Sequence, residues 1–332
     1  MVSQKLKVAL AALFAMACLI AFLLMDTPPS RGWQKTKVVI PKGSSSSDVA
    51  RLLTAGKVLQ HPIVFRTLVL GTMTRKRLRY GEYSFPEPPS VVEIWRKLVG
   101  GEVTRYSVTI PEGSNLYDIA KILGDLELVD PHIFLETAAS REVLRRLEVP
   151  GPTAEGFLFP DTYLLEKTLP AEDILEIMIR QFRRKFPPEW EFRAREEGFS
   201  LLQVITIASI IEKETGVAEE KPVVSAVIRK RLTLGMPLQM DPTVIYGLQR
   251  FGTELTRKDL HSPSPYNSYL NRGLPPGPIA NPGLTAIRAA VFPADTDYLY
   301  FVSRNDGSHK FSRTLEEHNQ GVASYRRDKT EE

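Results

Sequence analysis

The stretch that decides the architecture of this chain runs from Ser200 to Gly216 and reads SLLQVITIASIIEKETG. Its residues 201–211 are apolar on nearly every side of a helix, so we expect this helix to be buried. Ser200 followed three residues later by Gln203 is a capping-box pattern that predicts where the helix begins. Gly216 predicts where it ends. The last turn changes abruptly from apolar to polar.

That last turn carries two carboxylates, Glu212 and Glu214, at the helix end where acidic groups are electrostatically unfavourable. At about 100° per residue, Glu214 falls between Ile207, Ile210 and Ile211, whereas Glu212 falls on another side. Apolar surroundings and a helix C-terminus both disfavour an ionised carboxylate. Glu214 is therefore expected to keep its proton near neutral pH, as a general acid must. From the residues alone, a plainer interpretation stays open, in which both acids only solvate a helix end.

The composition excludes several classes of protein. The chain has 332 residues, of which 43% are hydrophobic and 25% charged, which is typical of a folded globular protein. Its net charge of +4 falls to +2 once Lys5 and Lys7 of the first 25 residues are left out, so it lacks the basic excess of a nucleic-acid-binding protein. Cys18 is the only cysteine, and the five histidines lack metal-site spacing, so we expect no disulfide, metal site or cofactor.

The N-terminus predicts a membrane anchor. Val8–Met25 is an uncharged stretch of 18 residues, about the length that spans the ~30 Å hydrocarbon core as a helix. Lys5 and Lys7 precede it, which predicts a cytoplasmic N-terminus and export of the remaining chain. A cleaved signal peptide ending at Ala17 and a lipoprotein anchor on Cys18 are the alternatives. Both are disfavoured because the apolar stretch continues for seven residues beyond Cys18.

An internal repeat follows the anchor. Val39–Ser44 (VIPKGS) returns as Thr109–Ser114 (TIPEGS), offset by 70 residues, and each copy continues into two helical patterns. A strand, a glycine turn and two helices are therefore expected twice. The copies resemble LysM-type glycan-binding modules, and a plain α+β spacer is the alternative.

The C-terminal half combines a second helix, expected over 218–232, with a proline-rich region over 235–283. Prolines together with Tyr, Asn, Gln and Asp are typical of the rigid walls of a cleft, although a stiff, well-packed irregular region would look the same. Residues 298–302 read as a strand, and Phe311 ends its expected hairpin partner.

At the level of whole motifs, the chain resembles the endolytic murein transglycosylase (YceG-like) family from the anchor to about Tyr325. The resemblance is carried by Glu155–Tyr163 (EGFLFPDTY), Ala208–Thr215 (ASIIEKET), Leu238–Tyr246 (LQMDPTVIY), Tyr266–Tyr269 (YNSY), Gly273–Gly283 (GLPPGPIANPG), Gly307–Phe311 (GSHKF) and Glu317–Asn319 (EHN).

The resemblance implies an inner-membrane enzyme that cleaves the MurNAc–GlcNAc bond within peptidoglycan strands and leaves a 1,6-anhydro-MurNAc end, limiting or terminating strand elongation. It implies Glu214 as the catalytic acid, with Glu212 as the alternative, and no water as nucleophile. The expected partners are glycan strands and cell-wall synthases (penicillin-binding proteins). The residues expected to position the glycan are Gln239, Asp241, Thr243, Tyr246, Tyr266, Asn267 and Asn281.

Two other functions stay open at this point. One is a peptidoglycan hydrolase that uses Asp241 as its second carboxylate. The other is a non-catalytic glycan-binding scaffold.

The expected fold is α+β, with an N-terminal membrane helix, a LysM-like subdomain and a lysozyme-like mixed catalytic domain. The expected boundaries are a cytoplasmic tail over 1–7, the anchor over 8–25, a linker over 26–36, the LysM-like region over 37–150, the catalytic domain over 151–325 and a charged tail over 326–332.

Overall fold

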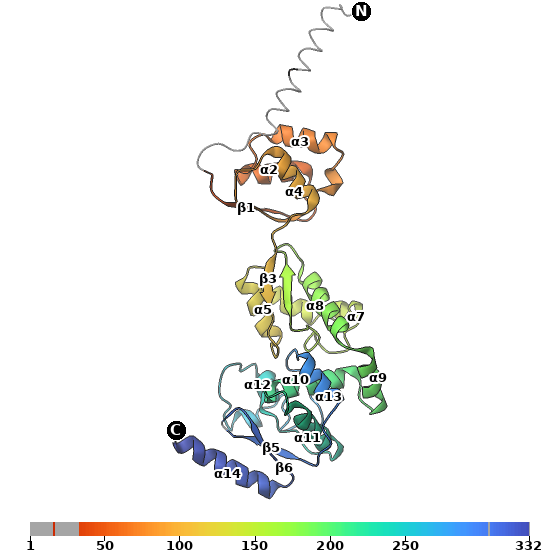
Figure 1. Ribbon diagram of the computed structural model, residues 1–332, viewed down its shortest axis with the longest axis vertical. Helices are drawn as coiled ribbons and strands as arrows, with labels where there is room; N and C mark the ends of the chain where they lie inside the picture. The colour runs from red at the N-terminus through yellow and green to blue at the C-terminus, as the bar shows by residue number, and fades with distance from the viewer. Residues whose placement is uncertain (1–15, 17–32, 305, 332) are drawn as a thin grey trace, which may run out of the picture. The chain divides into compact units, whose positions relative to one another are not determined.

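The computed structural model describes residues 33–304 and 306–331, together with Met16 (Figure 1). The expected cytoplasmic tail, the membrane anchor and the linker up to residue 32 lie outside the described residues. Within the part that is described, none of the helices has both the length and the apolar character needed to cross a bilayer. The described chain is a mixture of helices and small antiparallel sheets, so the expected α+β class is confirmed.

The contacts divide the chain into two compact units. Among the described residues, 33–107 and 164–169 form the N-terminal unit, and 108–163 and 170–331 form the C-terminal unit. The division therefore falls inside β3 (Tyr106–Thr109) and β4 (Thr162–Leu165) rather than at residue 150. The second copy of the repeat consequently belongs with the expected catalytic residues and not with the first copy.

The N-terminal unit is built from β1 (Thr36–Ile40), α2 (Ser46–Ala55), α3 (Pro62–Gly71), the short 3-10 helix η1 (Arg75–Arg77), β2 (Gly81–Phe85) and α4 (Val91–Gly100). β1 and β2 pair antiparallel, with Val38 opposite Tyr83. Apolar side chains of the strands and of α2, α3 and α4 form one core. In Figure 1, α2 lies between α3 and β1.

The repeat expected from the 70-residue offset is confirmed. The second copy consists of β3, α5 (Leu116–Asp125), α6 (Pro131–Ala138) and β4, with α7 (Arg141–Arg146) inserted before the last strand. In both copies the turn glycine adopts a positive φ, +85° at Gly43 and +75° at Gly113, which a residue with a side chain rarely adopts. Capping boxes then start the first helix of each copy, from Ser45 and Asn115.

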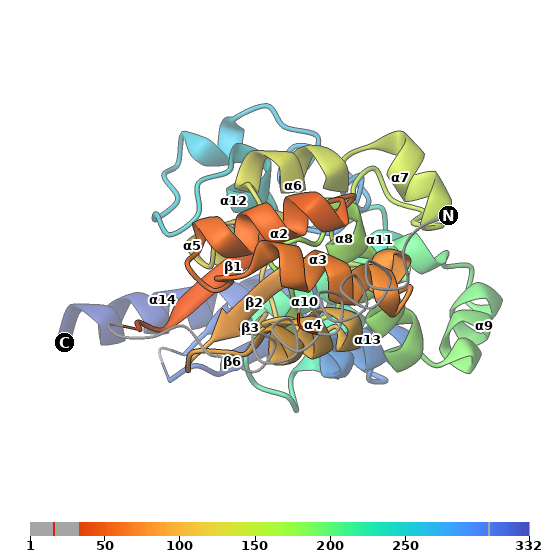
Figure 2. The same cartoon turned by 90° about the horizontal axis from the view of Figure 1, so that it is seen from above.

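The C-terminal unit is mainly helical, with α8 (Ala171–Lys185), α9 (Pro188–Glu196), α10 (Leu201–Glu214), α11 (Lys221–Thr233), α12 (Asp241–Leu248), the 3-10 helix η2 (Asp259–His261) and α13 (Leu284–Val291). α10 is the helix expected from the apolar stretch, and its residues 204–211 are all buried. It packs against α11, α12 and α13. Figure 2 shows α9 and α14 on opposite sides of this unit.

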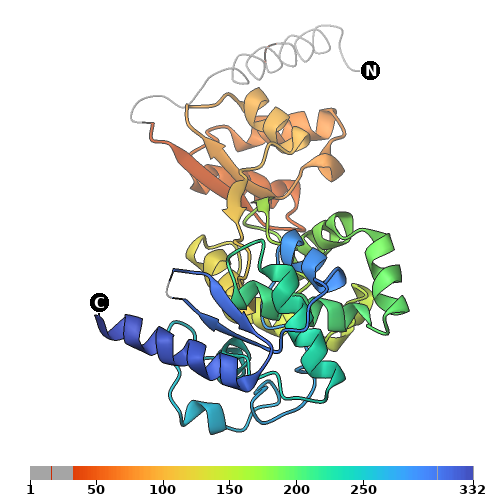
Figure 3. The same ribbon diagram turned by 60° about the horizontal axis from the view of Figure 1, so that its bottom comes forward.

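The chain ends with a hairpin and a helix. β5 (Tyr300–Ser303) pairs antiparallel with β6 (His309–Ser312), and Phe301 lies opposite Phe311, so the expected hairpin is confirmed. α14 (Leu315–Glu331) packs on both strands, as Figure 3 shows. The charged tail expected from residue 326 is a continuation of this helix.

Candidate active site

Glu214 is the last residue of α10, and its carboxyl group is held in an unusual environment. Among the described residues, its buried Oε1 atom has no hydrogen-bond partner. Burial, and secondarily the nearby charge of Asp241, raise the pKa of Glu214 from 4.5 to about 8. The carboxyl group therefore keeps its proton at neutral pH, as expected from its position on the helix.

Glu214 lies in a cleft of about 450 Å³ to which three distant parts of the chain contribute. The first part is the pair of helices α10 and α11, the second is the segment 238–241 with Tyr269, and the third is the C-terminal hairpin with α14. The residues that line the cleft are Glu214, Arg231, Leu238, Gln239, Met240, Asp241, Tyr269, Phe301, Val302, Ser303, His309 and His318.

Asp241 and Gln239 form one wall of this cleft, as expected from the sequence. The Tyr269 hydroxyl donates a hydrogen bond of 2.6 Å to Oδ1 of Asp241. The pKa of Tyr269 is raised by burial and by this hydrogen bond, so the phenol stays protonated and remains a donor. Gln239 has a φ of +55°, a strained conformation for a residue with a side chain, which turns the chain sharply beside Asp241.

Arg231, from the last turn of α11, brings a buried cation to the cleft. Its guanidinium donates to the carbonyl oxygens of Leu238 and Leu299, both at 2.8 Å, and lies over the Tyr300 ring, 5.1 Å from the centroid. Burial lowers the pKa of Arg231 from its ordinary value, which is so high that the guanidinium keeps its charge. Arg231 thereby joins segment 238–241 to the C-terminal hairpin.

Two histidines, His309 and His318, also line the cleft. His309 Nδ1 lies 2.7 Å from Oε2 of Glu220, and the His309 backbone N–H donates to Oε1 of the same carboxylate at 2.8 Å. His318 stacks on Tyr300, with 5.3 Å between the ring centroids. Burial and the positive charge of Arg231 lower the pKa of His318, so its ring is neutral at neutral pH.

Glu212, the alternative acid, lies in a different environment from Glu214. Its Oε1 accepts a hydrogen bond from the Lys221 ammonium at 3.0 Å, and its Oε2 accepts one from the Gly283 N–H at 2.9 Å. Glu212 is therefore an ion-paired, hydrogen-bonded carboxylate, and it does not line the cleft around Glu214. The geometry therefore favours Glu214 over Glu212 as the acid.

Two of the expected glycan-positioning residues, Tyr246 and Asn281, take part in a buried network away from the cleft. The network centres on Glu155, which is fully buried. Glu155 accepts hydrogen bonds from the Tyr246 hydroxyl at 3.0 Å, the Asn281 amide at 2.9 Å and the Leu116 N–H at 2.9 Å. Tyr266 packs against Tyr246, with 5.0 Å between ring centroids. Burial raises the pKa of Glu155 to about 8, so this carboxyl group, like that of Glu214, favours its protonated form at neutral pH.

Thr243 and Asn267, also expected to position the glycan, are fully buried. The Thr243 hydroxyl bonds to the Met240 carbonyl at 2.6 Å, and the Asn267 amide donates to the carbonyls of Leu260 and Ser262. The structure therefore does not bring Thr243, Tyr246, Tyr266, Asn267 or Asn281 to the cleft around Glu214. The side chains of Thr243, Tyr246, Asn267 and Asn281 instead form hydrogen bonds with backbone and side-chain partners inside the unit.

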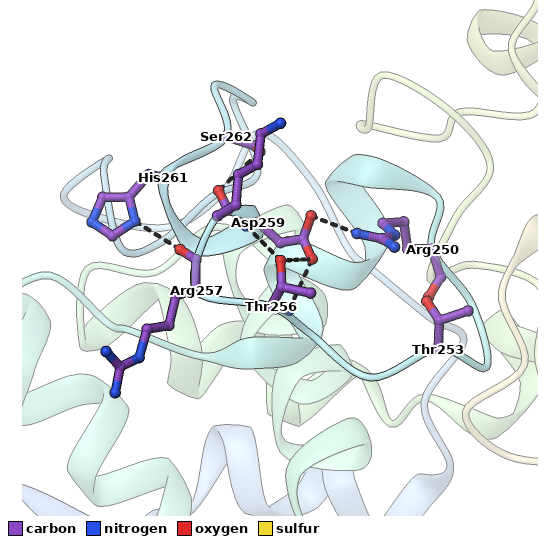
Figure 4. A network of polar contacts seen from close by, with 8 residues as sticks. Arg250, Thr253, Thr256, Arg257, Asp259, His261 and Ser262 are labelled. Carbon is purple, nitrogen blue, oxygen red and sulfur yellow. Dashed lines mark hydrogen bonds and ion pairs between the residues drawn. The ribbon is translucent and has the colours of Figure 1, made fainter.

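The loop after α12 is stiffened in the same way (Figure 4). Asp259 accepts hydrogen bonds from the N–H and hydroxyl of Thr256, at 2.9 and 2.7 Å, and forms an ion pair of 2.6 Å with Arg250. The expected rigid region between the helices is thus supported by a polar network.

Arg231 and Tyr269 were not among the site residues expected from the sequence, and His309 entered only as part of the motif Gly307–Phe311. The signal available for His309 and His318 was their place in short motifs near the C-terminus. For Arg231 no local signal exists, because a basic residue in the last turn of a helix is already favourable. Within residues 33–304 and 306–331, no group of three or more His, Cys, Asp or Glu side chains is placed to hold a metal ion.

Comparison with known proteins identifies the family. The model of the YceG-like family matches residues 38–324. An endolytic murein transglycosylase of Bacillus subtilis is 31% identical over 311 residues, which cover 88% of this chain and 85% of that protein. One from Streptococcus pneumoniae is 27% identical over 87% of this chain, which spans only 58% of that longer protein.

A solved structure has the same fold. The crystal structure of a YceG-like protein from Listeria monocytogenes matches with a TM-score of 0.60 and 32% identity, covering 87% of this chain and 99% of that one. From the family match over most of its length, the chain belongs to the YceG-like family.

Proposed function

We propose that this chain is an endolytic lytic transglycosylase that cleaves the MurNAc–GlcNAc bond of peptidoglycan strands. The observation that carries the proposal is the buried Oε1 of Glu214, which lines the cleft and has no hydrogen-bond partner among the described residues, together with the raised pKa of this carboxyl group. Relatives that share about 30% identity over most of the chain are named for this activity. A scaffold protein without catalysis has no need for such a carboxyl group, whose burial costs stability.

In the proposed reaction, Glu214 donates its proton to the glycosidic oxygen as the bond between that oxygen and C1 of MurNAc breaks. The C6 hydroxyl of the same MurNAc then attacks C1, and the new bond closes the 1,6-anhydro ring. The hydroxyl proton passes to the Glu214 carboxylate, which restores the acid. No water is consumed, so a single carboxylate serves as acid and then as base.

Asp241 has a supporting role in this proposal. Its negative charge in the cleft favours the protonated form of Glu214 and stabilises the positive charge that develops at C1. The Tyr269 hydroxyl holds the Asp241 carboxylate in place.

Asp241 also supports a second candidate, a hydrolase in which this carboxylate activates water, because it shares the cleft with Glu214. Mass spectrometry of the products separates the two reactions, since an anhydro end is lighter by one water than a hydrolysed end. We expect anhydro ends from the full chain. Reducing MurNAc ends would instead establish the hydrolase.

A pair of matched variants tests whether Glu214 or Glu212 is the catalytic acid. Glu214→Gln removes the proton donor and is expected to abolish product formation. Glu212→Gln removes an ion-paired carboxylate outside the cleft and is expected to retain the anhydro product, at a reduced yield if folding suffers. Full activity of Glu214→Gln together with loss in Glu212→Gln would overturn the assignment.

The N-terminal unit is proposed to bind glycan as a LysM-like module. Its order of strand, helix, helix and strand supports this, as does a cavity of about 680 Å³ beside the Gly43 turn. Tyr80 lies in that cavity, with the Lys42 ammonium 5.6 Å from its ring centroid. Pull-down of the full chain on purified glycan strands, in a Glu214→Gln background, should weaken when Tyr80 is replaced by alanine.

The second copy of the repeat has lost this open turn. The Gly113 N–H donates to the Asn281 carbonyl at 2.9 Å, and the Lys213 ammonium donates to the Gly113 carbonyl at 3.2 Å. The turn is thus covered by segments that belong to the catalytic helices and loops. We assign glycan binding to the first copy for this reason, and a structural role to the second.

The proposal also includes an uncleaved N-terminal anchor in the inner membrane, with both units on the extracytoplasmic side, and cell-wall synthases as partners. The uncharged stretch Val8–Met25 behind Lys5 and Lys7 supports the anchor and its orientation. Protease protection of the full chain in spheroplasts tests both, since residues beyond the anchor should be digested from outside.

A further inference from the structure

Helix α3 of the N-terminal unit and the turn that follows it present apolar side chains to solvent. Ile63, Leu70 and Met73 are 77%, 56% and 86% exposed, values far above those of ordinary core residues. Ile63 and Leu70 are seven residues apart and so lie on the same side of the helix. The opposite side of α3, with Val64 and Phe65, is buried in the core of the unit.

Basic residues occur within and directly after this apolar segment of the chain. Arg66 lies between Ile63 and Leu70 along the helix, and Arg75 and Lys76 follow Met73 in η1. All three basic side chains are exposed. We call the set of Ile63, Leu70, Met73, Arg66, Arg75 and Lys76 the α3 patch.

The charge of the whole unit has the same sign. Residues 33–107 and 164–169 contain 14 Lys and Arg against 6 Asp and Glu, a net charge of +8. Residues 108–163 and 170–332 contain 26 against 32, a net charge of −6. The net charge of the whole chain is small because a strongly basic N-terminal unit and an acidic C-terminal unit nearly cancel.

We propose that the α3 patch docks on an anionic phospholipid surface and holds the N-terminal unit against the bilayer. Exposed aliphatic side chains bordered by Lys and Arg are the combination that inserts shallowly at the headgroup level while the cations contact lipid phosphates. A protein partner would equally cover the apolar side chains, but the excess of eight positive charges favours an anionic surface.

The position of the α3 patch in the sequence, shortly after the expected membrane anchor, also supports a phospholipid surface as its binding partner. Only residues 26–32 separate the apolar stretch Val8–Met25 from Trp33, the first residue of the described unit. Seven residues span at most about 25 Å when fully extended. This step rests on the proposed membrane anchor, which would keep the unit close enough to the bilayer for contacts that are weak by themselves to form.

The contribution of charge can be anticipated. Each Lys or Arg near an anionic surface contributes about fivefold to binding, an effect that salt screens. Reversal of Arg66, Arg75 and Lys76 to glutamate is therefore expected to lower the docked-to-undocked ratio by more than about a hundredfold.

The test places a fluorophore on the patch of the full chain. Cys18 is the only cysteine, so a Cys18→Ser background allows one label at a chosen position. Ile63→Cys places an environment-sensitive dye on α3, and Val39→Cys, at a 43% exposed site on β1, is the matched control in the same unit. Both chains are reconstituted into vesicles of neutral phosphatidylcholine, with or without 30% phosphatidylglycerol.

We expect a blue shift of the dye at position 63 only in vesicles that contain phosphatidylglycerol, and none at position 39. The shift should disappear in the triple glutamate variant and in 0.5 M salt. Equal emission from positions 63 and 39 in anionic vesicles would refute the proposal. A blue shift at position 63 that is as large in neutral vesicles as in anionic vesicles would refute it too. Two controls test the other proposals separately. Retention of the protein in the vesicles after an alkaline wash tests the membrane anchor, and analysis of the glycan products tests catalysis. A failure of either is thereby distinguished from a failure of docking.

Discussion

We predict that replacing Glu214 with glutamine changes the pH dependence of the free energy of unfolding, in addition to the activity. The Glu214 side chain has a pKa of about 8 in the folded protein and an ordinary value of 4.5 when exposed. The folded state therefore binds one more proton than the unfolded state between these two pH values. Glutamine occupies nearly the same volume and does not titrate, so the comparison isolates this proton.

The sign and size of the stability difference between the parent chain and Glu214→Gln follow from the linkage between proton binding and folding. Because the folded pKa is raised, the wild-type chain loses stability relative to the variant as the pH rises from about 4.5 to about 8. At about 1.4 kcal/mol per pH unit, the full difference amounts to at most 4–5 kcal/mol. Glu214 is only partly shielded from solvent, so we expect about 2–3 kcal/mol.

The assay is urea denaturation of the full chain in neutral detergent, at pH 5 and pH 8.5. Fluorescence of Trp190, which packs against Phe186 and Phe292 in the C-terminal unit, reports unfolding there, with Trp33 and Trp95 replaced by phenylalanine. Glu214→Gln should gain stability over the parent chain at pH 8.5 relative to pH 5.

A matched control separates this effect from a general loss of charge. Glu212→Gln breaks the pairing with Lys221 and should destabilise the chain at both pH values. If the difference between Glu214→Gln and its parent chain were the same at pH 5 and pH 8.5, the carboxyl group would be ordinarily ionised and the reasoning from burial would be refuted.

Three further predictions concern the cleft and the buried network. The rate of anhydro-product formation should fall above pH 8 as Glu214 loses its proton, and a rate that stays flat to pH 10 would contradict this. Tyr269→Phe removes the hydrogen bond to Asp241 and should lower kcat by about 10-fold with little change in the melting temperature, whereas an unchanged kcat would exclude a positioning role. Asn281→Ala removes a donor to buried Glu155 and should cost about 1–3 kcal/mol of stability while leaving the product unchanged, so altered products without destabilisation would place Asn281 in the reaction after all.

The local features of this protein could be predicted from the sequence. The limits of α10 follow from a capping box at Ser200 and from the polar turn that precedes Gly216. The 70-residue repeat, with its positive-φ glycines at 43 and 113, and the hairpin that pairs β5 with β6 also follow from short patterns. Each depends on backbone hydrogen bonds and conformations within a few residues, which neighbouring side chains specify directly.

The partners of the polar residues could not be predicted in this way. Tyr246 and Asn281 have the side chains of sugar-binding residues, but they satisfy buried Glu155, which lies 91 and 126 residues away in the chain. Arg231 and His318 reach the cleft only because α11 packs against α10, and because α14 packs against the C-terminal hairpin that lines the same cleft.

The sequence by itself determined which residues form α10 and that an acid ends it on an apolar side. Only the tertiary structure decided that Oε1 of Glu214 is buried without a hydrogen-bond partner in the described part of the chain, whereas Glu212 pairs with Lys221. It also decided that the second repeat joins the C-terminal unit. The physical reason is that helix limits and turns depend on local interactions, whereas burial and charge pairing depend on segments that meet only when the whole chain has folded.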